Sequence, residues 1–370
     1  PDPPTPTTTP EVLRIGVDLA VPRALADSLS LQDAQFAADA AQAQLILRVG
    51  DQQVIAYWVY ALAAPFTSLV DRLTTQELRQ AWRGQAERAL EGRKLLMTAE
   101  TLQAWQAYWG EPAPGAVKIL EAGELLDYAW GHQPAFAIMP FGALEPRWKV
   151  LEIDGMSPLR KEFSAEDPQY PLNLPISAAA QTEQAQAWLA AHLPGSPTQF
   201  LPLSNRDPGK LTTVALTGVT ALVRATANTM EIQGVTYPAR DVGEILRSAD
   251  LAHVSNEVPF ARNCPTPNPT QPSLRFCSDA RYIGLLEEVG TDVVELTGDH
   301  FADWGAEAML YTLDLYRERG WGYYGGGENL ADGLKPLLLE HNGNKIAFIG
   351  CNAKGGIYAS ADANTPGAAY

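Results

Sequence analysis

The strongest constraint on the fold is a regular alternation of short apolar runs and helix-forming segments in the second half of the chain. Five strands are expected, at Leu211–Thr217, Leu251–Glu257, Asp292–Thr297, Gly322–Tyr324 and Lys345–Gly350. Helices are expected between them, at Arg240–Ser248, Ala280–Val289 and Gly305–Arg319, and a glycine turn that begins at Gly325 leads into Leu330–Lys335. Strands that alternate with helices form parallel sheets joined by right-handed crossovers. The second half is therefore predicted to be an α/β domain with a parallel sheet.

Side chains that can carry chemistry follow two of these strands. Glu257 ends one strand, and Asp299, His300 and Asp303 follow the next. Ligands of open parallel sheets bind at the carboxyl ends of the strands, so we expect these side chains to meet at one rim with Ser255. Carboxylates beside an imidazole suit one divalent metal ion or a general acid–base pair. The alternative is structural, because Asp299 and Asp303 are also good N-caps for the following helix.

The three cysteines give a second constraint. Cys264 and Cys277 bracket a loop with four prolines, in which few backbone hydrogen bonds are available. A disulfide would fix this loop and stabilise the fold by about 3 kcal/mol in the chain-entropy model. A zinc pair or two buried thiols are the alternatives, although no nearby histidine accompanies the pair. Cys351 ends an apolar run and is expected to be a buried, reduced thiol.

The first half is also predicted to be an α/β domain. Strands are expected at Val12–Leu19, Leu45–Val49, Val54–Ala63 and Ala135–Met139. Helices are expected at Leu31–Ala43, Thr75–Trp82, Ala99–Trp109, Glu121–Trp130 and Gln181–His192. Clusters of Pro, Gly, Ser and Asn over residues 193–210 are typical of a linker. These patterns divide the chain into a first domain at 11–192, a linker at 193–210 and a second domain at 211–370.

The charge of the chain excludes some classes of partner. Its formal net charge is −16 and its pI is about 4.7. A protein that binds nucleic acid or anionic lipid needs concentrated Lys and Arg, so neither is expected as a partner. No apolar stretch approaches the ~20 residues of a membrane span. Residues 1–10 consist of Pro, Thr and one Asp and are expected to form an extended tether. The tether and the cysteine pair favour an extracytoplasmic location.

Several motifs from residue 211 onward resemble the bacterial capsule-synthesis CapA family (PGA_cap, poly-γ-glutamate synthesis). Residues 255–259 read Ser-Asn-Glu-Val-Pro, residues 297–305 read Thr-Gly-Asp-His-Phe-Ala-Asp-Trp-Gly, and residues 325–330 read Gly-Gly-Gly-Glu-Asn-Leu. The family is similar in fold to calcineurin-like metallophosphatases. The resemblance implies that Glu257, Asp299 and His300 lie at a metal-binding rim, with Asp303 as a further candidate catalytic residue.

This chain departs from the family pattern in two respects. Val219 stands where the family's Gly-Asp turn has a metal-binding aspartate, and a valine cannot coordinate an ion. The family domain also continues past the point where residue 370 falls, so the CapA-like domain is expected to be incomplete at its C-terminus. A tight two-metal centre is therefore not expected. The site is expected either to hold one divalent ion weakly or to form a hydrogen-bonded Glu/Asp–His network instead. Thr220 and Asn352 are expected near its edge.

The first half resembles type 2 periplasmic solute-binding proteins of the phosphate type. The resemblance rests on residues 64–84, which end in Trp-Arg-Gly, and on residues 137–141 and 170–172. The Ser-Gly-rich anion-binding loop of that family has no counterpart, and residues 95–100 read Leu-Leu-Met-Thr-Ala-Glu instead. Four cations of the first half could hold an anion, but surface charge is the favoured interpretation for Arg14, Arg23, Lys94 and Arg147.

These observations predict an extracytoplasmic, cell-surface protein of the CapA type. It would bind or scaffold an anionic cell-surface polymer or a small anionic ligand, with a degenerate metal site. The alternative is a metal-dependent phosphoesterase-like or polymer-processing hydrolase. Val219 and the missing anion loop favour binding, whereas Glu257, Asp299, His300 and Asp303 favour catalysis.

Overall fold

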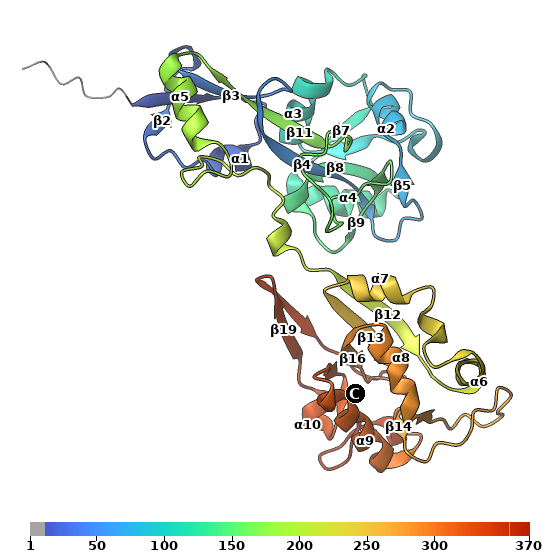
Figure 1. Cartoon of the computed structure of the whole chain (residues 1–370). Helices are drawn as coiled ribbons and strands as arrows, with labels where there is room; N and C mark the ends of the chain where they lie inside the picture. The colour runs from blue at the N-terminus through green and yellow to red at the C-terminus, as the bar shows by residue number, and fades with distance from the viewer. Residues whose placement is uncertain (1–11, 355) are drawn as a thin grey trace, which may run out of the picture. The chain divides into compact units, whose positions relative to one another are not determined.

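The computed structural model describes residues 12–354 and 356–370, and the chain divides into two compact units (Figure 1). The first unit spans residues 1–208 and the second spans residues 209–370. Each has its own hydrophobic core. The expected tether at 1–10 lies outside the described residues. Within the described part of the chain, no helix is both long and apolar enough to span a bilayer.

The first unit is built on a mixed sheet of nine strands. These are β1 (Leu13–Val17), β2 (Ala34–Phe36), β3 (Leu45–Val49), β4 (Val54–Pro65), β6 (Leu95–Met97), β7 (Val117–Ile119), β8 (Phe136–Pro140), β9 (Trp148–Val150) and β11 (Asn173–Ala180). Their order is β2-β1-β3-β11-β4-β8-β6-β7, with β9 paired to β4. A separate pair is formed by β5 (Arg72–Leu73) and β10 (Glu152–Ile153).

Five helices accompany this sheet. They are α1 (Arg23–Asp27), α2 (Thr75–Trp82), α3 (Ala99–Trp109), α4 (Leu125–Gly131) and α5 (Glu183–His192). The start of α2 is set by a capping box, in which the Thr74 hydroxyl accepts from the Glu77 amide and the Glu77 carboxylate accepts from the Thr74 amide. Helices α2 and α3 have the bounds that the sequence predicts, and the α/β class is confirmed.

Two parts of the first unit differ from the sequence prediction. The expected helix at Leu31–Ala43 is wrong, because residues 34–36 form β2 and pair in parallel with β1. Pairing at the edge of the sheet overrides the helix preference of an alanine-rich segment. The strand β11 was not expected, since its sequence contains Pro175 and a run of alanines, yet it lies between β3 and β4.

The end of the expected linker packs onto the first unit. Phe200 and Leu201 are buried in its core. The Asn205 side chain hydrogen-bonds the backbone N–H and C=O of Val59, as a neighbouring strand would. The Arg206 guanidinium donates to three backbone carbonyls, those of Pro158, Arg160 and Phe163. Residues 199–206 are therefore part of the first unit, and the division falls at 208/209.

The second unit contains a four-stranded parallel sheet, as predicted. Its strands are β12 (Val214–Thr220), β13 (Leu251–Asn256), β16 (Thr291–Glu295) and β17 (Gly322–Tyr324), paired in this order. Its helices are α6 (Arg224–Gln233), α7 (Gly243–Ser248), α8 (Ile283–Glu288), α9 (Gly305–Glu318) and α10 (Leu330–Gly333). Because sequential strands are neighbours, their carboxyl ends lie side by side.

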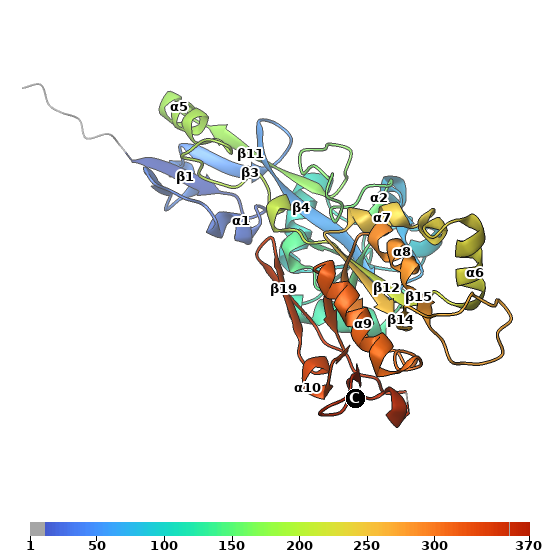
Figure 2. The ribbon, with the colours of Figure 1, turned by 60° about the horizontal axis from the view of Figure 1, so that its bottom comes forward.

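The two faces of this sheet differ. Alternate residues of β13 and β16, such as Val254 and Val294, are buried with apolar side chains of α6, α8 and α9. The ribbons of these three helices are labelled in Figure 2. The other face carries His253, Ser255 and Glu295. Two short pairs complete the carboxyl end of the unit, β14 (Phe260–Ala261) with β15 (Ser278–Asp279), and β18 (Gly326–Gly327) with β21 (Gly367–Ala368).

The last expected strand of the sheet is instead part of a hairpin. β19 (Leu337–His341) and β20 (Asn344–Phe348) pair antiparallel and form a separate two-stranded sheet. Asn342 and Gly343, both with positive φ, form the turn. The prediction that Lys345–Gly350 extends the parallel sheet is therefore wrong. The prediction of a buried Cys351 is also wrong: its thiol is exposed, because it follows this hairpin rather than a covered strand.

Candidate functional site at the strand ends

Three side chains from the ends of β13 and β16 come together. Glu257 follows β13 directly, and Asp299 and His300 lie in the turn after β16. One oxygen or nitrogen atom from each of the three lies within 4.8 Å of the others. All three residues are half-buried. The parallel order of β13 and β16 brings together residues that are about 40 positions apart in the sequence.

The close approach of the two turns depends on Gly298. A Cβ atom at this position would lie 2.8 Å from the Cα atom of Glu257 and 2.7 Å from its Cγ atom. Such distances are too short for any side chain, and one of these two atoms belongs to the backbone of Glu257. Only glycine therefore allows this direct contact between the two turns.

Asp303 acts on the cluster through His300. The His300 Nδ1 atom lies 2.7 Å from the Asp303 Oδ2 atom, and Asp303 also accepts a hydrogen bond from the Phe276 amide at 2.8 Å. The Phe276 ring lies against the imidazole, with centroids 4.9 Å apart. These contacts fix the orientation of the ring and leave Nε2 as the nitrogen available for a ligand. A carboxylate that holds the other nitrogen is the usual support of a metal-binding histidine.

The pKa values of the two carboxyl groups of the cluster shift in opposite directions. Burial raises the pKa of the Glu257 carboxyl, and its hydrogen bond with Asp299 raises it further, whereas the charge of His300 opposes this shift. The Lys354 ammonium, 2.9 Å from Asp299 Oδ2, holds the pKa of the Asp299 carboxyl below its usual range. A protonated Glu257 that donates to an ionised Asp299 satisfies both groups. Two carboxylates this close share one proton more readily than both ionise.

The cluster fits one divalent ion better than two. Glu257, Asp299 and His300 offer two oxygen ligands and one nitrogen ligand, a set that suits a borderline divalent metal. An ion bound there would have to displace the Lys354 ammonium from Asp299. A two-metal centre needs carboxylates that bridge ions about 3.5–4 Å apart. Val219, at the expected position of one such ligand, is a 66% exposed residue of β12.

The other expected rim residues are placed as follows. The Thr220 carbonyl accepts a hydrogen bond from the Glu257 amide at 3.3 Å, so Thr220 borders the cluster. The Asn352 side chain accepts from the Lys354 amide at 2.9 Å and shapes the turn that carries this lysine. Ser255 donates to Glu295 instead of joining Glu257. The strand ends at Asn256, so the period of two that links Ser255 to Glu257 does not continue.

A second polar group lies on the face that carries Ser255. The His253 Nε2 atom lies 2.9 Å from the Tyr324 hydroxyl, and the His253 ring stacks on Phe348 from β20. Burial lowers the pKa of His253, while the charge of Glu295 partly offsets this effect. Because it is buried and packed between aromatic rings, we interpret His253 as a structural residue that joins the hairpin to the sheet.

Sequence reasoning missed Lys354. It follows Asn352, which was expected near the rim, by two positions. Lys354 could have been predicted from chemistry, because two adjacent carboxylates without a metal ion need a nearby cation.

Two of the four cations named above for the first unit, Arg23 and Arg147, form ion pairs with carboxylates. Arg147 pairs with Glu145 at 2.6 Å and with Asp127 at 3.7 Å, and Arg23 pairs with Asp27 at 3.6 Å. The cavity of about 320 Å³ that contains Arg147 also holds three carboxylates, those of Glu100, Asp127 and Glu145. An acidic lining of this kind disfavours a phosphate-type ligand.

Residues 213–369 match the family model for the bacterial capsule synthesis protein PGA_cap. The capsule biosynthesis protein CapA of Bacillus anthracis is 23% identical over 150 residues, which is 40% of this chain and 36% of that protein. This chain thus spans about a third of the length of that relative. The family expected from the motifs of residues 211–370 is confirmed for the PGA_cap region.

Two solved structures resemble the chain. An ABC-type phosphate transport receptor from Vibrio cholerae has 14% identity and a TM-score of 0.39, covering 48% of this chain and 92% of that one. A putative phosphate ABC transporter substrate-binding protein with bound phosphate from Clostridium perfringens has 15% identity and a TM-score of 0.33, covering 48% and 91%. The same class of protein was expected from the motifs of residues 11–192.

Proposed function

We propose that this chain is an extracytoplasmic protein of the capsule-synthesis type that binds or scaffolds an anionic cell-surface polymer. The match of residues 213–369 to the PGA_cap model supports the role in capsule synthesis. The polymer implied by the sequence resemblance is poly-γ-glutamate. A disulfide between Cys264 and Cys277 supports a location outside the reducing cytoplasm.

The observation that carries the binding role is the state of the rim cluster. Lys354 neutralises Asp299, and Glu257 is placed to share a proton with it. In this arrangement the two carboxylates already have partners and need no metal. The residues that would complete a two-metal centre include an aspartate at position 219, where this chain has Val219.

The direct test combines binding and hydrolysis on the same preparation. The full chain should bind poly-γ-glutamate immobilised on a sensor surface and should not hydrolyse a generic phosphodiester in the presence of Mn²⁺. If the chain binds no anionic polymer at all, the proposal is contradicted. Phosphodiester hydrolysis that is lost in Glu257→Gln would replace it with the alternative below.

The second candidate function is a hydrolase that uses a single metal ion. It is favoured by the three ligand atoms of Glu257, Asp299 and His300, and by the Asp303 carboxylate that orients His300. A bound divalent ion would supply Lewis acidity to a substrate oxygen. The chain's own Asp303 carboxylate would then orient the His300 imidazole toward the ion.

A further inference from the structure

We propose that two adjoining cavities lined by Trp304 form a groove that binds the carboxylates of an extended polycarboxylate peptide chain. One cavity, of about 300 Å³, lies beside the disulfide and includes Arg224, Arg275 and Phe276. The other, of about 270 Å³, includes Arg262 and Tyr311. Trp304 lines both cavities, and neither includes the rim cluster. This inference rests on the proposed function, because it assigns a place where the polymer would be held.

The arginines of this groove are unlike the other arginines of the second unit. Five arginines outside the groove form ion pairs with carboxylates, namely Arg240, Arg247, Arg281, Arg317 and Arg319. Within residues 12–354 and 356–370, no carboxylate forms an ion pair with Arg224, Arg262 or Arg275. The chain as a whole is negative, with a net charge of −16. Three guanidinium groups without a carboxylate partner surround the two adjoining cavities, so this region carries local positive charge.

Each of these guanidinium groups lies over an aromatic ring. The guanidinium carbon of Arg262 is 4.1 Å from the centre of the Tyr311 ring, that of Arg275 is 5.1 Å from Trp304, and that of Arg224 is 5.9 Å from Phe276. Stacking on a ring restricts a guanidinium group while its N–H donors stay available at the edges. Less side-chain entropy is then lost when an anion binds.

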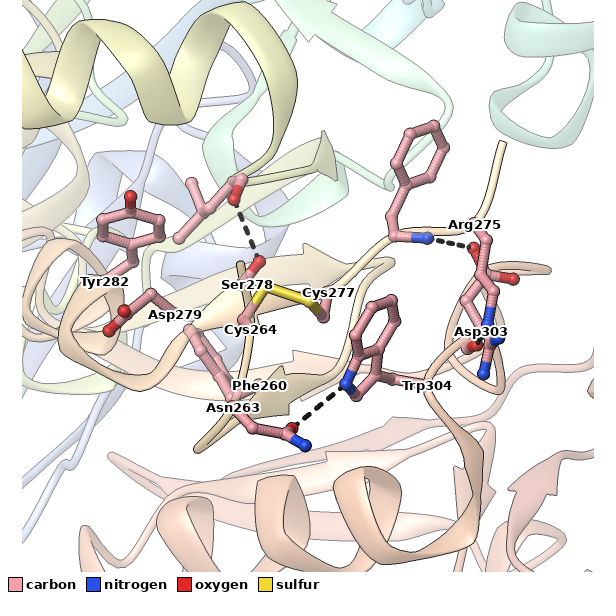
Figure 3. Close-up of a disulfide and its surroundings, with 12 residues drawn as sticks. Phe260, Asn263, Cys264, Arg275, Cys277, Ser278, Asp279, Tyr282, Asp303 and Trp304 are labelled. Atoms are coloured by element: carbon pink, nitrogen blue, oxygen red, sulfur yellow. Dashed lines mark hydrogen bonds between the residues drawn. A yellow bond between two sulfur atoms is a disulfide. The ribbon is translucent and has the colours of Figure 1, made fainter. Parts of the chain in front are cut away.

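The walls of the groove are held in place by covalent and hydrogen bonds. The disulfide closes the loop that carries Arg275, and the Trp304 indole N–H donates to the Asn263 side chain at 3.2 Å (Figure 3). The Arg275 Nε atom also donates to the Asp303 carbonyl at 2.6 Å. Arg224 has a φ of 51°, which is rare for a residue other than glycine and is often found at ligand sites.

The chemistry of the groove favours carboxylates on a flexible peptide chain. Guanidinium groups occupy ring faces of Trp304, Tyr311 and Phe276 on which a sugar would otherwise stack, so an acidic polysaccharide fits less well. Arginine also matches the planar carboxylate through two parallel hydrogen bonds. Asp279 in the groove is neutralised by Arg281 at 3.1 Å, which leaves Glu307 as the lining carboxylate that opposes an anion.

The test measures binding of a fluorescent ten-residue glutamate peptide to the full chain by fluorescence polarisation. Arg262→Gln and Arg275→Gln should each weaken binding about fivefold, and the double variant more than tenfold. Arg262 forms no hydrogen bond within the described residues, so its variant should fold normally. Glu307→Gln should tighten binding about twofold, because it removes a like charge. Added salt should weaken binding.

Arg240→Gln is the matched control. Arg240 is exposed and also lies over a ring, that of Tyr237, but it pairs with Asp241 outside both cavities. Its variant should bind within a factor of about two of the original chain. Unchanged affinity in the Arg262/Arg275 double variant would refute the groove while leaving polymer binding intact. Stronger competition by an oligogalacturonate or by polyphosphate would refute the peptide ligand. Binding to none of these anions would refute both the groove and the proposed function.

Discussion

Among single residues, Lys354 has the largest influence on what the rim cluster can bind. Its ammonium group stands 2.9 Å from Asp299 and competes with any divalent ion for that carboxylate. The substitution Lys354→Gln should therefore tighten the binding of Mn²⁺ to the cluster about two- to fivefold. Isothermal titration calorimetry measures this affinity.

Lys335→Gln provides the control for this change. Lys335 is also an exposed lysine paired with an aspartate, Asp332, at 3.3 Å, but it lies outside the cluster. Mn²⁺ affinity should not change in this variant. Equal or weaker binding by Lys354→Gln would show that the lysine does not occupy the position of an ion.

Gly298 is the residue on which the shape of the cluster depends. A Cβ atom there would collide with backbone and side-chain atoms of Glu257. Gly298→Ala should lower the free energy of unfolding by about 1–3 kcal/mol, measured by urea denaturation of the full chain. Gly218→Ala, where no atom lies within 4 Å of an added Cβ, should change it much less. Equal effects would contradict the close contact.

The sequence could predict which residues meet at the rim but not how they are neutralised. Glu257, Asp299 and His300 follow neighbouring parallel strands, and that topology is readable from the alternation of elements. Lys354 belongs to an irregular segment after a hairpin, where no periodicity fixes its position. Ser255 was assigned to the wrong partner because the strand ends one residue before Glu257.

At the scale of secondary-structure elements, the loop between β14 and β15 depends on its disulfide. The bond joins Cys264 and Cys277, 13 positions apart, in a segment with few backbone hydrogen bonds. The double variant Cys264→Ser/Cys277→Ser should lose about 3 kcal/mol of stability in urea denaturation under non-reducing conditions. Cys351→Ser should change stability by less than about 0.5 kcal/mol, because this thiol is exposed.

Alkylation of the native protein before reduction, followed by peptide mass spectrometry, tests the disulfide between Cys264 and Cys277 independently. Only Cys351 should be modified in the native protein, and Cys264 and Cys277 should appear as one cross-linked peptide. Modification of all three thiols would contradict both the disulfide and the extracytoplasmic proposal.

The elements that were predicted wrongly share a physical cause. Residues 34–36 form β2 and residues 344–348 form half of a hairpin, and in both segments the partner strand decides the outcome. Local periodicity reports the preference of a segment but not its partner. By contrast, α2 and α3 begin at the threonine caps Thr74 and Thr98, which are local signals, and their bounds were predicted correctly.

At the scale of the whole molecule, the position of the boundary between the two units can be tested with trypsin. Arg206 is buried and its guanidinium is held by three carbonyls, whereas Lys210 is exposed. Brief digestion should therefore cut first after Lys210 and not after Arg206. Fragments are identified by intact mass. A first cut within residues 13–206 would contradict the packing of residues 199–206 onto the first unit.

The central claim is that the second unit holds at most one ion and acts by binding rather than by two-metal hydrolysis. Elemental analysis of the full chain, purified and dialysed with Mn²⁺, tests it most directly. We expect at most one equivalent of metal per chain and no phosphodiester hydrolysis. The variant Glu257→Gln should lose any bound metal. Two equivalents of metal per chain, together with hydrolysis that Glu257→Gln abolishes, would contradict the account.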